Sequence, residues 1–191
     1  MAAIQVLSIL GSPRRAGNTA RVLDWIEEAL RETGSTVERV STGDRDIRPC
    51  TGCFACKLQP GSLCVQRDDA NELYGKMRDT NLVLLATPIY CFGFPSPLKA
   101  LLDRSVCLVS EFGQVGHASV IEGRRIGLVA TGEGPIERNL DLLVGPFELL
   151  CDYWKARDAG HLLVPGCTRP EDMDSDVQTR ARQFAEALAT G

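Results

Sequence analysis

Three short, almost uninterrupted apolar runs constrain the fold of this 191-residue chain more than any other feature. They lie at Ile4 to Leu10, Asn81 to Ala86 and Arg125 to Ala130, and each run ends in a loop rich in glycine or proline. Strands that are apolar at nearly every position are typical of parallel sheets, because helices cover both faces of such sheets. We therefore expect helices between the strands.

Apolar residues at helical spacing follow the strands, as a parallel sheet requires. One helix is expected from Thr19 to about Gly34, and Asp68 or Asp69 can cap another that carries Leu73 and Met77. Weaker strands are predicted at 37–40 and 161–164. The other expected segments are a helix from Pro97, a surface excursion over 105–123, a helical stripe over 136–154 with a kink at Gly145–Pro146, and a closing helix over 177–188.

Five strands in about 190 residues fit a flavodoxin-like, doubly wound parallel sheet of strand order 2-1-3-4-5, with helices on both faces. We expect one domain over residues 1–191, with a cysteine-rich loop at 47–67 after the second strand. Ligands of such sheets bind beyond the carboxyl ends of the strands. The three loops that leave strands there begin at Gly11, Thr87 and Thr131.

Four of the eight cysteines lie in the segment from Pro49 to Cys64, at Cys50, Cys53, Cys56 and Cys64. Two gaps of two residues and one of seven favour an iron–sulfur cluster, because the Cys-x2-Cys-x2-Cys core resembles compact cluster-binding runs. Zinc, which prefers two separated Cys-x2-Cys pairs, and reactive or incidental thiols remain alternatives. Four nearby cations would either offset a cluster's negative charge or lie in solvent: Arg45, Arg48, Lys57 and Arg67.

The loop from Gly11 to Thr19 has the composition of a phosphate-binding loop. Ser12, Arg14, Asn18 and Thr19 offer side-chain donors, and the start of a helix offers unpaired backbone N–H groups. Neither a Walker A loop nor a Gly-x-Gly-x-x-Gly fingerprint is present. The alternative is a polar turn with a well-capped helix.

The loop from Thr87 to Pro95 carries three aromatic residues in five positions, and they favour an apolar wall for a flat ring. Core packing is the alternative interpretation. Gly132 and Gly134 permit a close approach of ligand to backbone, although a plain turn explains them equally well. Cys151 lies on an apolar stripe and is predicted to be core, and a role for Cys91 stays open.

The net charge of −4 argues against a general nucleic-acid-binding surface. The apolar opening segment is better explained as a buried strand than as a signal peptide or a membrane span. We therefore expect a cytoplasmic protein in a reducing compartment, where eight cysteines are not expected to form disulfides.

These motifs resemble the NADPH-dependent FMN reductase and multimeric flavodoxin superfamily. The resemblance is carried by Gly-Ser-Pro-Arg-x(3)-Asn-Thr after the first strand and by Thr-Pro-Ile-Tyr, followed by Pro-Leu-Lys-Ala-Leu-Leu-Asp-Arg, after the third. The segment from Ile47 to Asp69, with its four cysteines, is similar to the iron–sulfur flavoproteins within that superfamily. The resemblance runs from about Ile4 to Arg104.

The resemblance implies two cofactors, FMN and a [4Fe–4S] cluster near the flavin, and a homodimer or homotetramer with flavin sites at subunit contacts. It implies FMN phosphate on Ser12, Arg14, Asn18 and Thr19, and a cluster on Cys50, Cys53, Cys56 and Cys64. The implied contacts of the flavin ring are Pro88, Ile89, Tyr90, Phe92, Thr131 and Gly132. The seven-residue gap before Cys64 departs from the most compact form of the motif, and a turn at Pro60–Gly61 would bring the fourth sulfur within reach.

The predicted function is electron transfer between a ferredoxin or NAD(P)H donor and a small acceptor, without a nucleic-acid or membrane partner. No general base is predicted, because electron transfer needs none. One alternative is a cluster-free NAD(P)H-dependent FMN or quinone reductase. A second is a zinc-binding flavodoxin-like module without redox activity.

Overall fold

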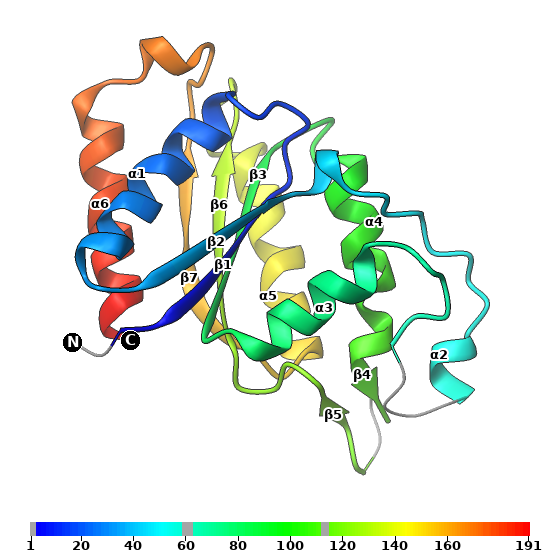
Figure 1. Cartoon of the computed structure of the whole chain (residues 1–191). Helices are drawn as coiled ribbons and strands as arrows, with labels where there is room; N and C mark the ends of the chain where they lie inside the picture. The colour runs from blue at the N-terminus through cyan, green and yellow to red at the C-terminus, as the bar shows by residue number, and fades with distance from the viewer. Residues whose placement is uncertain (1–2, 59–62, 112–114) are drawn as a thin grey trace.

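The computed structural model describes residues 3–58, 63–111 and 115–191. A five-stranded parallel sheet runs through the middle of the molecule in the order β2-β1-β3-β6-β7 (Figure 1). Counted along the chain this is 2-1-3-4-5, so the predicted flavodoxin-like order is confirmed. The strands are β1 (Gln5–Leu10), β2 (Thr36–Ser41), β3 (Leu82–Pro88), β6 (Arg125–Thr131) and β7 (Arg157–Val164).

Helices cover both faces of this sheet, as predicted (Figure 1). On one face, α1 (Asn18–Glu32) and α6 (Ser175–Thr190) pack side by side. On the other face lie α3 (Ala70–Asp79), α4 (Ser96–Arg104) and α5 (Val144–Tyr153). The chain therefore has two hydrophobic cores, one on each side of the sheet.

The central strands supply both cores at once, which explains their continuous apolar sequences. In β3, Leu82 and Leu84 belong to the core under α1 and α6, whereas Val83 and Leu85 belong to the core under α3, α4 and α5. Successive side chains of a strand point to opposite faces, so a strand covered on both sides must be apolar at every position.

The prediction of one kinked helix over 136–154 is wrong. A short 3-10 segment, η3 (Leu140–Leu143), precedes α5, which begins at Val144. Pro146 lies in the first turn of α5, where its missing N–H breaks no helical hydrogen bond. The Gly145–Pro146 pair therefore lies near a helix start instead of a kink.

The predicted surface excursion over 105–123 is wrong at both of its ends. The 3-10 segment η2 (Ser105–Leu108) follows α4 and leads into a two-stranded antiparallel sheet of β4 (Val109–Ser110) and β5 (Ala118–Ser119). Leu108, Val109 and Ile121 are buried. This segment therefore closes one end of the core.

The loop between β2 and α3 contains two short elements, η1 (Thr42–Asp44) and α2 (Ala55–Leu58), and a last 3-10 turn, η4 (Pro170–Asp172), precedes α6. Across the described ranges, none of the helices is both long and apolar enough to cross a membrane.

Candidate functional site

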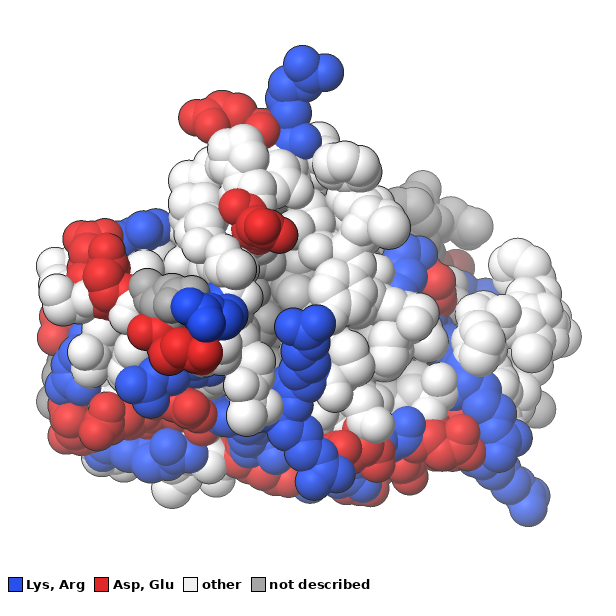
Figure 2. Space-filling model, turned by 90° about the horizontal axis from the view of Figure 1, so that it is seen from above, with Lys and Arg blue, Asp and Glu red and all other residues white. Residues whose placement is uncertain are grey.

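Three loops meet at the edge of the sheet where β1, β3 and β6 end, as the fold predicts. The N–H of Gly11 donates to the carbonyl of Ala86 at 2.7 Å, and the N–H of Ile89 donates to the carbonyl of Thr131 at 2.9 Å. Figure 2 views the molecule from this side and shows a broad uncharged area, with most charged side chains around it. This edge is therefore one connected surface.

The loop before α1 fits a phosphate group. The N-cap position of α1 is Gly17, which provides no side-chain cap, so the first-turn N–H groups keep their donor capacity. The Ser12 hydroxyl is buried at the loop and accepts the N–H of Arg14 at 3.1 Å. An uncapped helix start with a polar loop is a favourable anion site, because the helix dipole also attracts negative charge.

Two of the predicted phosphate donors are engaged with the protein itself. The Asn18 amide donates to the carbonyl of Cys167 at 2.8 Å, and its Oδ1 atom is buried without a hydrogen-bond partner among the described residues. The hydroxyls of Thr19 and Thr131 are buried and hydrogen-bond each other at 2.7 Å. Asn18 and Thr19 therefore hold the loops together, which leaves Ser12, Arg14 and the backbone N–H groups as the donors for a phosphate.

The loop after β3 forms a tight reverse turn that exposes two aromatic rings. Tyr90 and Gly93 exchange two backbone hydrogen bonds of 3.0 Å, and Cys91 and Phe92 between them have φ angles of 46° and 64°. Left-handed backbone is unfavourable for such residues and is commonly retained for function. Phe92 is 69% exposed and Tyr90 42% exposed. Phe94, in contrast, packs against the core.

Gly132 allows the loops after β3 and β6 to approach each other closely. A Cβ atom at this position would lie 2.8 Å from Cγ2 of Ile89 and 3.2 Å from Cδ2 of Leu140. Gly132 also donates its N–H to Val164 and accepts the N–H of Cys167. We therefore interpret Gly132 as a packing requirement of this surface.

Gly132→Ala is expected to lower the free energy of unfolding by about 1–3 kcal/mol, because the added methyl group must displace Ile89. FMN affinity should fall as well, since Ile89 is a predicted ring contact. Chemical denaturation and FMN titration measure the two effects. Gly75→Ala, at a helical position where a Cβ meets nothing within 4 Å, is the control and should not weaken FMN binding.

The cysteine-rich loop is closed at its neck by hydrogen bonds between its two ends. Asp46 and Asp69 are joined by two hydrogen bonds, of 2.9 and 3.0 Å. The Asp68 carboxylate accepts the N–H of Arg48 at 3.0 Å and the N–H of Ala70 at 3.2 Å. Asp68, instead of Asp69, thus supplies the predicted side-chain acceptor at the start of α3, and the same carboxylate fixes the loop.

The four clustered cysteines line one cavity of about 190 Å³, together with Asp103, Arg104 and Val106. Cys64 is held there by Asn71, whose side-chain amide accepts its N–H at 3.1 Å and donates to its carbonyl at 2.7 Å. The predicted turn at Pro60–Gly61 lies outside the described residues. The shared cavity and the Asn71 contact place Cys64 with the other three cysteines despite the seven-residue gap.

The backbone of this loop also suits thiolate ligands. Gly52 has a φ of 65° and donates its N–H to the sulfur of Cys50 at 3.5 Å. The backbone N–H of Ala55 and then the hydroxyl of Thr51 lower the pKa of Cys53. Fe–S clusters in proteins are held mainly by Cys thiolates, so this donor set fits a cluster. Within the described ranges, no three His, Cys, Asp or Glu side chains come together closely enough to hold a metal ion.

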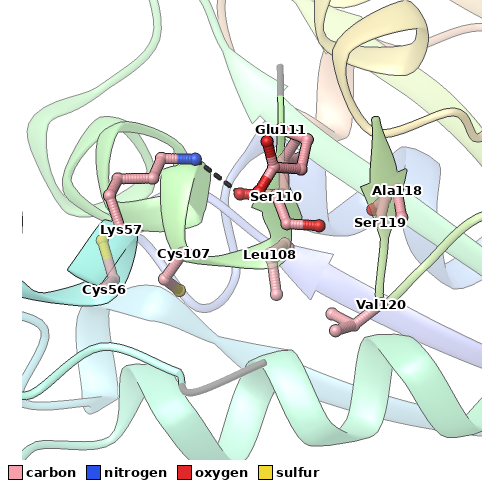
Figure 3. Close-up of a pocket in the computed structure, with 10 residues that line it drawn as sticks. Cys56, Lys57, Cys107, Leu108, Ser110, Glu111, Ala118, Ser119 and Val120 are labelled. Atoms are coloured by element: carbon pink, nitrogen blue, oxygen red, sulfur yellow. Dashed lines mark hydrogen bonds between the residues drawn. The ribbon is translucent and has the colours of Figure 1, made fainter. Parts of the chain in front are cut away.

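A second cavity lies beside α2 and is lined by Cys56, Lys57, Cys107 and residues of β4 and β5 (Figure 3). The Lys57 amine donates to the carbonyl of Val109, which ties α2 to β4. Burial, with the neighbouring Cys64 and Cys56, raises the pKa of Cys107 to about 12. A fifth sulfur therefore lies beside the predicted ligands, and the spacing pattern did not identify it.

The cysteines and the flavin loop lie at opposite ends of α4. The loop from Thr87 to Pro95 enters the N-terminal end of this helix, whereas the cysteine cavity is lined by Asp103 and Arg104 at its C-terminal end. Figure 1 shows the cysteine-rich loop descending beside α4 to α2. Within one chain, the length of α4 therefore separates the four cysteines from the loop predicted to contact the flavin ring.

Three of the cations predicted to lie beside the cysteines bind other parts of the protein. Arg45 pairs with Glu72 at 3.3 Å and Arg48 with Asp46 at 2.9 Å, and Lys57 reaches β4. The guanidinium that lines the cysteine cavity is that of Arg104. Sequence reasoning missed Arg104, although it closes the Pro-Leu-Lys-Ala-Leu-Leu-Asp-Arg segment.

Comparison with known proteins finds a family match and relatives that cover most of this chain. The model of the family described as NADPH-dependent FMN reductase matches residues 4–140 of this chain. An iron–sulfur flavoprotein of Archaeoglobus fulgidus is 30% identical over 188 residues, covering 97% of this chain and 79% of the relative. An iron–sulfur flavoprotein of Methanosarcina thermophila is 34% identical, covering 65% of this chain and 66% of the relative.

Solved structures share the fold at low sequence identity. An FMN-dependent NADH-azoreductase from Bacillus anthracis, in complex with FMN, has a TM-score of 0.75 and 15% identity, covering 97% of this chain and 100% of that chain. An NAD(P)H:quinone oxidoreductase from Methanothermobacter marburgensis has a TM-score of 0.70 and 17% identity, covering 98% of this chain and 96% of that chain.

Proposed function

This chain is an FMN-dependent oxidoreductase of the NADPH-dependent FMN reductase family, and we propose that it also binds a [4Fe–4S] cluster on Cys50, Cys53, Cys56 and Cys64. We propose that it transfers electrons between a ferredoxin or NAD(P)H donor and a small acceptor. The observation that carries this proposal is the single cavity shared by these four cysteine side chains. The names of the iron–sulfur flavoprotein relatives support it.

The two cofactors would divide the chemistry between them. Bound FMN exchanges electrons in pairs or singly and a [4Fe–4S] cluster exchanges one at a time, so together they connect two-electron and one-electron carriers. The protein's part is to bind and orient the cofactors. No side chain is proposed as an acid or base, in keeping with the absence of any predicted catalytic residue.

At the flavin site, we propose that Ser12, Arg14 and the first-turn N–H groups of α1 hold the phosphate. Asn18 and Thr19 keep the loop in place through Cys167 and Thr131. The predicted ring contacts stay as proposed: Pro88, Ile89, Tyr90, Phe92, Thr131 and Gly132. Thr131 is buried, so its contact with the ring would be through the backbone, and its carbonyl also accepts the N–H of Ile89 and so positions that residue.

The exposed aromatic rings of the loop after β3 support an oligomer, because a subunit contact would remove them from water. We propose a homodimer or homotetramer whose subunit contact covers the exposed rings of Tyr90 and Phe92. We further propose one FMN-binding domain over 1–191, a cytoplasmic location, and no nucleic-acid or membrane partner.

Anaerobic reconstitution with FMN, iron and sulfide tests this function. The protein should contain FMN together with about four iron and about four acid-labile sulfide per chain. A yellow, iron-free protein that NAD(P)H reduces rapidly would instead be a cluster-free reductase, in line with the 30% identity to an FMN-dependent NAD(P)H:quinone oxidoreductase of Pseudomonas aeruginosa. A colourless protein that contains zinc would contradict both.

A further inference from the structure

Arg104, the last residue of α4, has a fully buried guanidinium, and the whole residue is only 1% exposed. It forms an ion pair with Asp68, whose side chain is equally inaccessible to solvent. Its Nη1 atom also donates to the carbonyl of Arg48 at 3.1 Å. These contacts use one nitrogen of the guanidinium.

The other two nitrogens of Arg104 are not satisfied by the protein. Nε and Nη2 are both buried, and neither has a hydrogen-bond partner among the described residues. Unpaired buried donors of a charged group are costly, and in native proteins they commonly indicate an ion or group that completes the site. Arg104 therefore has donors to offer a ligand.

The cavity that Arg104 lines is the one lined by the four clustered cysteines. Cys64, the cysteine that follows the seven-residue gap, lines this cavity together with Arg104. A negatively charged sulfur group in this cavity would accept hydrogen bonds from the N–H groups of Nε and Nη2. The site thus combines thiol ligands with a buried cation that faces them.

On the premise of the proposed cluster, we propose that Arg104 is a positioning residue that donates N–H···S hydrogen bonds from Nε and Nη2 to Cys64 and the cluster bound there. These bonds hold the fourth ligand in place beyond its seven-residue gap. They also stabilise the cluster more in its reduced, more negative state, which raises its reduction potential.

A purely structural role for Arg104 makes a different prediction. If the residue only fastens the neck of the loop to α4, any cation that pairs with Asp68 should replace it. Lysine keeps the charge and the ion pair but lacks the planar fork, so it cannot direct separate donors to Asp68 and to sulfur in the same way. Arg104→Lys therefore distinguishes the two roles.

The test compares reconstituted wild-type protein with Arg104→Lys, with the charge-neutral double variant Arg104→Gln/Asp68→Asn, and with Arg48→Gln. Arg48 precedes the first cysteine, but its side chain is exposed and pairs with Asp46, so its variant removes a nearby charge without removing a donor from the cavity. Thermal unfolding, FMN content and iron content are measured first. The midpoint potential of the cluster is then determined by redox titration followed by electron paramagnetic resonance.

We expect a lower cluster potential in Arg104→Lys and in the double variant, with wild-type FMN content, and no comparable shift in Arg48→Gln. Should Arg104→Lys not fold, the double variant, which leaves no unpaired charge, gives the measurement. An unchanged potential in the Arg104 variants would overturn the proposal while leaving the proposed function intact. An equal shift in Arg48→Gln would also overturn it. A wild-type protein without iron would refute the proposed cluster itself.

Discussion

Asp68→Ala is expected to lower the free energy of unfolding by about 3–5 kcal/mol, because it leaves the buried Arg104 guanidinium without its counter-charge. The same change removes the acceptor of two backbone N–H groups, those of Arg48 and Ala70. The Asp68 carboxylate thus joins α4, the start of the cysteine loop and the start of α3. Urea denaturation of the apoprotein measures the loss.

Asp103→Ala is the matched control, because Asp103 lies on α4 beside Arg104 but forms an exposed i,i+4 pair with Lys99. Exposed pairs of this kind contribute under about 1 kcal/mol. A loss at Asp68 no larger than the loss at Asp103 would contradict the role of the buried pair. The double variant Asp68→Leu/Arg104→Met, which removes both charges, should be more stable than Asp68→Ala.

The pH dependence of stability provides an independent check on Asp68. Burial alone would raise the pKa of this carboxyl, but Arg104 and the N–H groups of Arg48 and Ala70 hold it below its ordinary value. A carboxyl with a lowered folded-state pKa stabilises the protein above the unfolded-state pKa of about 4 and loses that contribution as the pH falls further. The stability gap between wild type and Asp68→Asn should therefore narrow below about pH 4.

The central sheet could be predicted from the sequence because burial on both faces leaves a direct signal. Val83 and Leu84 point into different cores, so the apolar run that contains them has one simple explanation. Segments that contribute only one or a few side chains to a core leave a weaker pattern in the sequence. Trp154, for example, is fully buried and donates to Ser105 at 3.0 Å, across 49 residues of sequence.

The sequence predicted which residue types form the candidate site, but it did not predict which of those residues contact each other. The polar composition of the Gly11 loop indicated donors, but Thr19 and Thr131 are 112 residues apart, and their hydrogen bond follows only from strand order. Arg104 was missed for a similar reason. An arginine at the end of an amphipathic helix usually lies in solvent, and its burial depends on Asp68, 36 residues earlier.

The cysteine spacing predicted a shared cavity but not its location. Spacing constrains how closely thiols can approach each other, whereas the path of the loop depends on the neck at Asp68 and on the anchoring of α2 by Lys57. Those contacts draw the cysteines along α4, away from the loop that enters its first turn. The remaining question about the motif is which sulfur completes the ligand set.

Cys64→Ala is expected to remove the [4Fe–4S] cluster, because the proposed site is left with three of its four thiolate ligands. Iron and acid-labile sulfide per chain should fall to less than about half of the wild-type values after anaerobic reconstitution. FMN content should stay at the wild-type level, since the flavin loops lie at the other end of α4. Cys151→Ala, at a buried cysteine of the hydrophobic core, is the control and should keep the full iron content.

The outcome that would contradict this assignment is a Cys64→Ala variant with wild-type iron and sulfide. The structure identifies the residue to examine next in that case, because Cys107 shares the second cavity with Cys56 (Figure 3). Cys107→Ala would then lose the cluster while Cys64→Ala kept it. If Cys64 is the ligand, the two variants should behave in the opposite way, because Cys64 lines the cavity shared by the clustered cysteines, whereas Cys107 lines the second cavity.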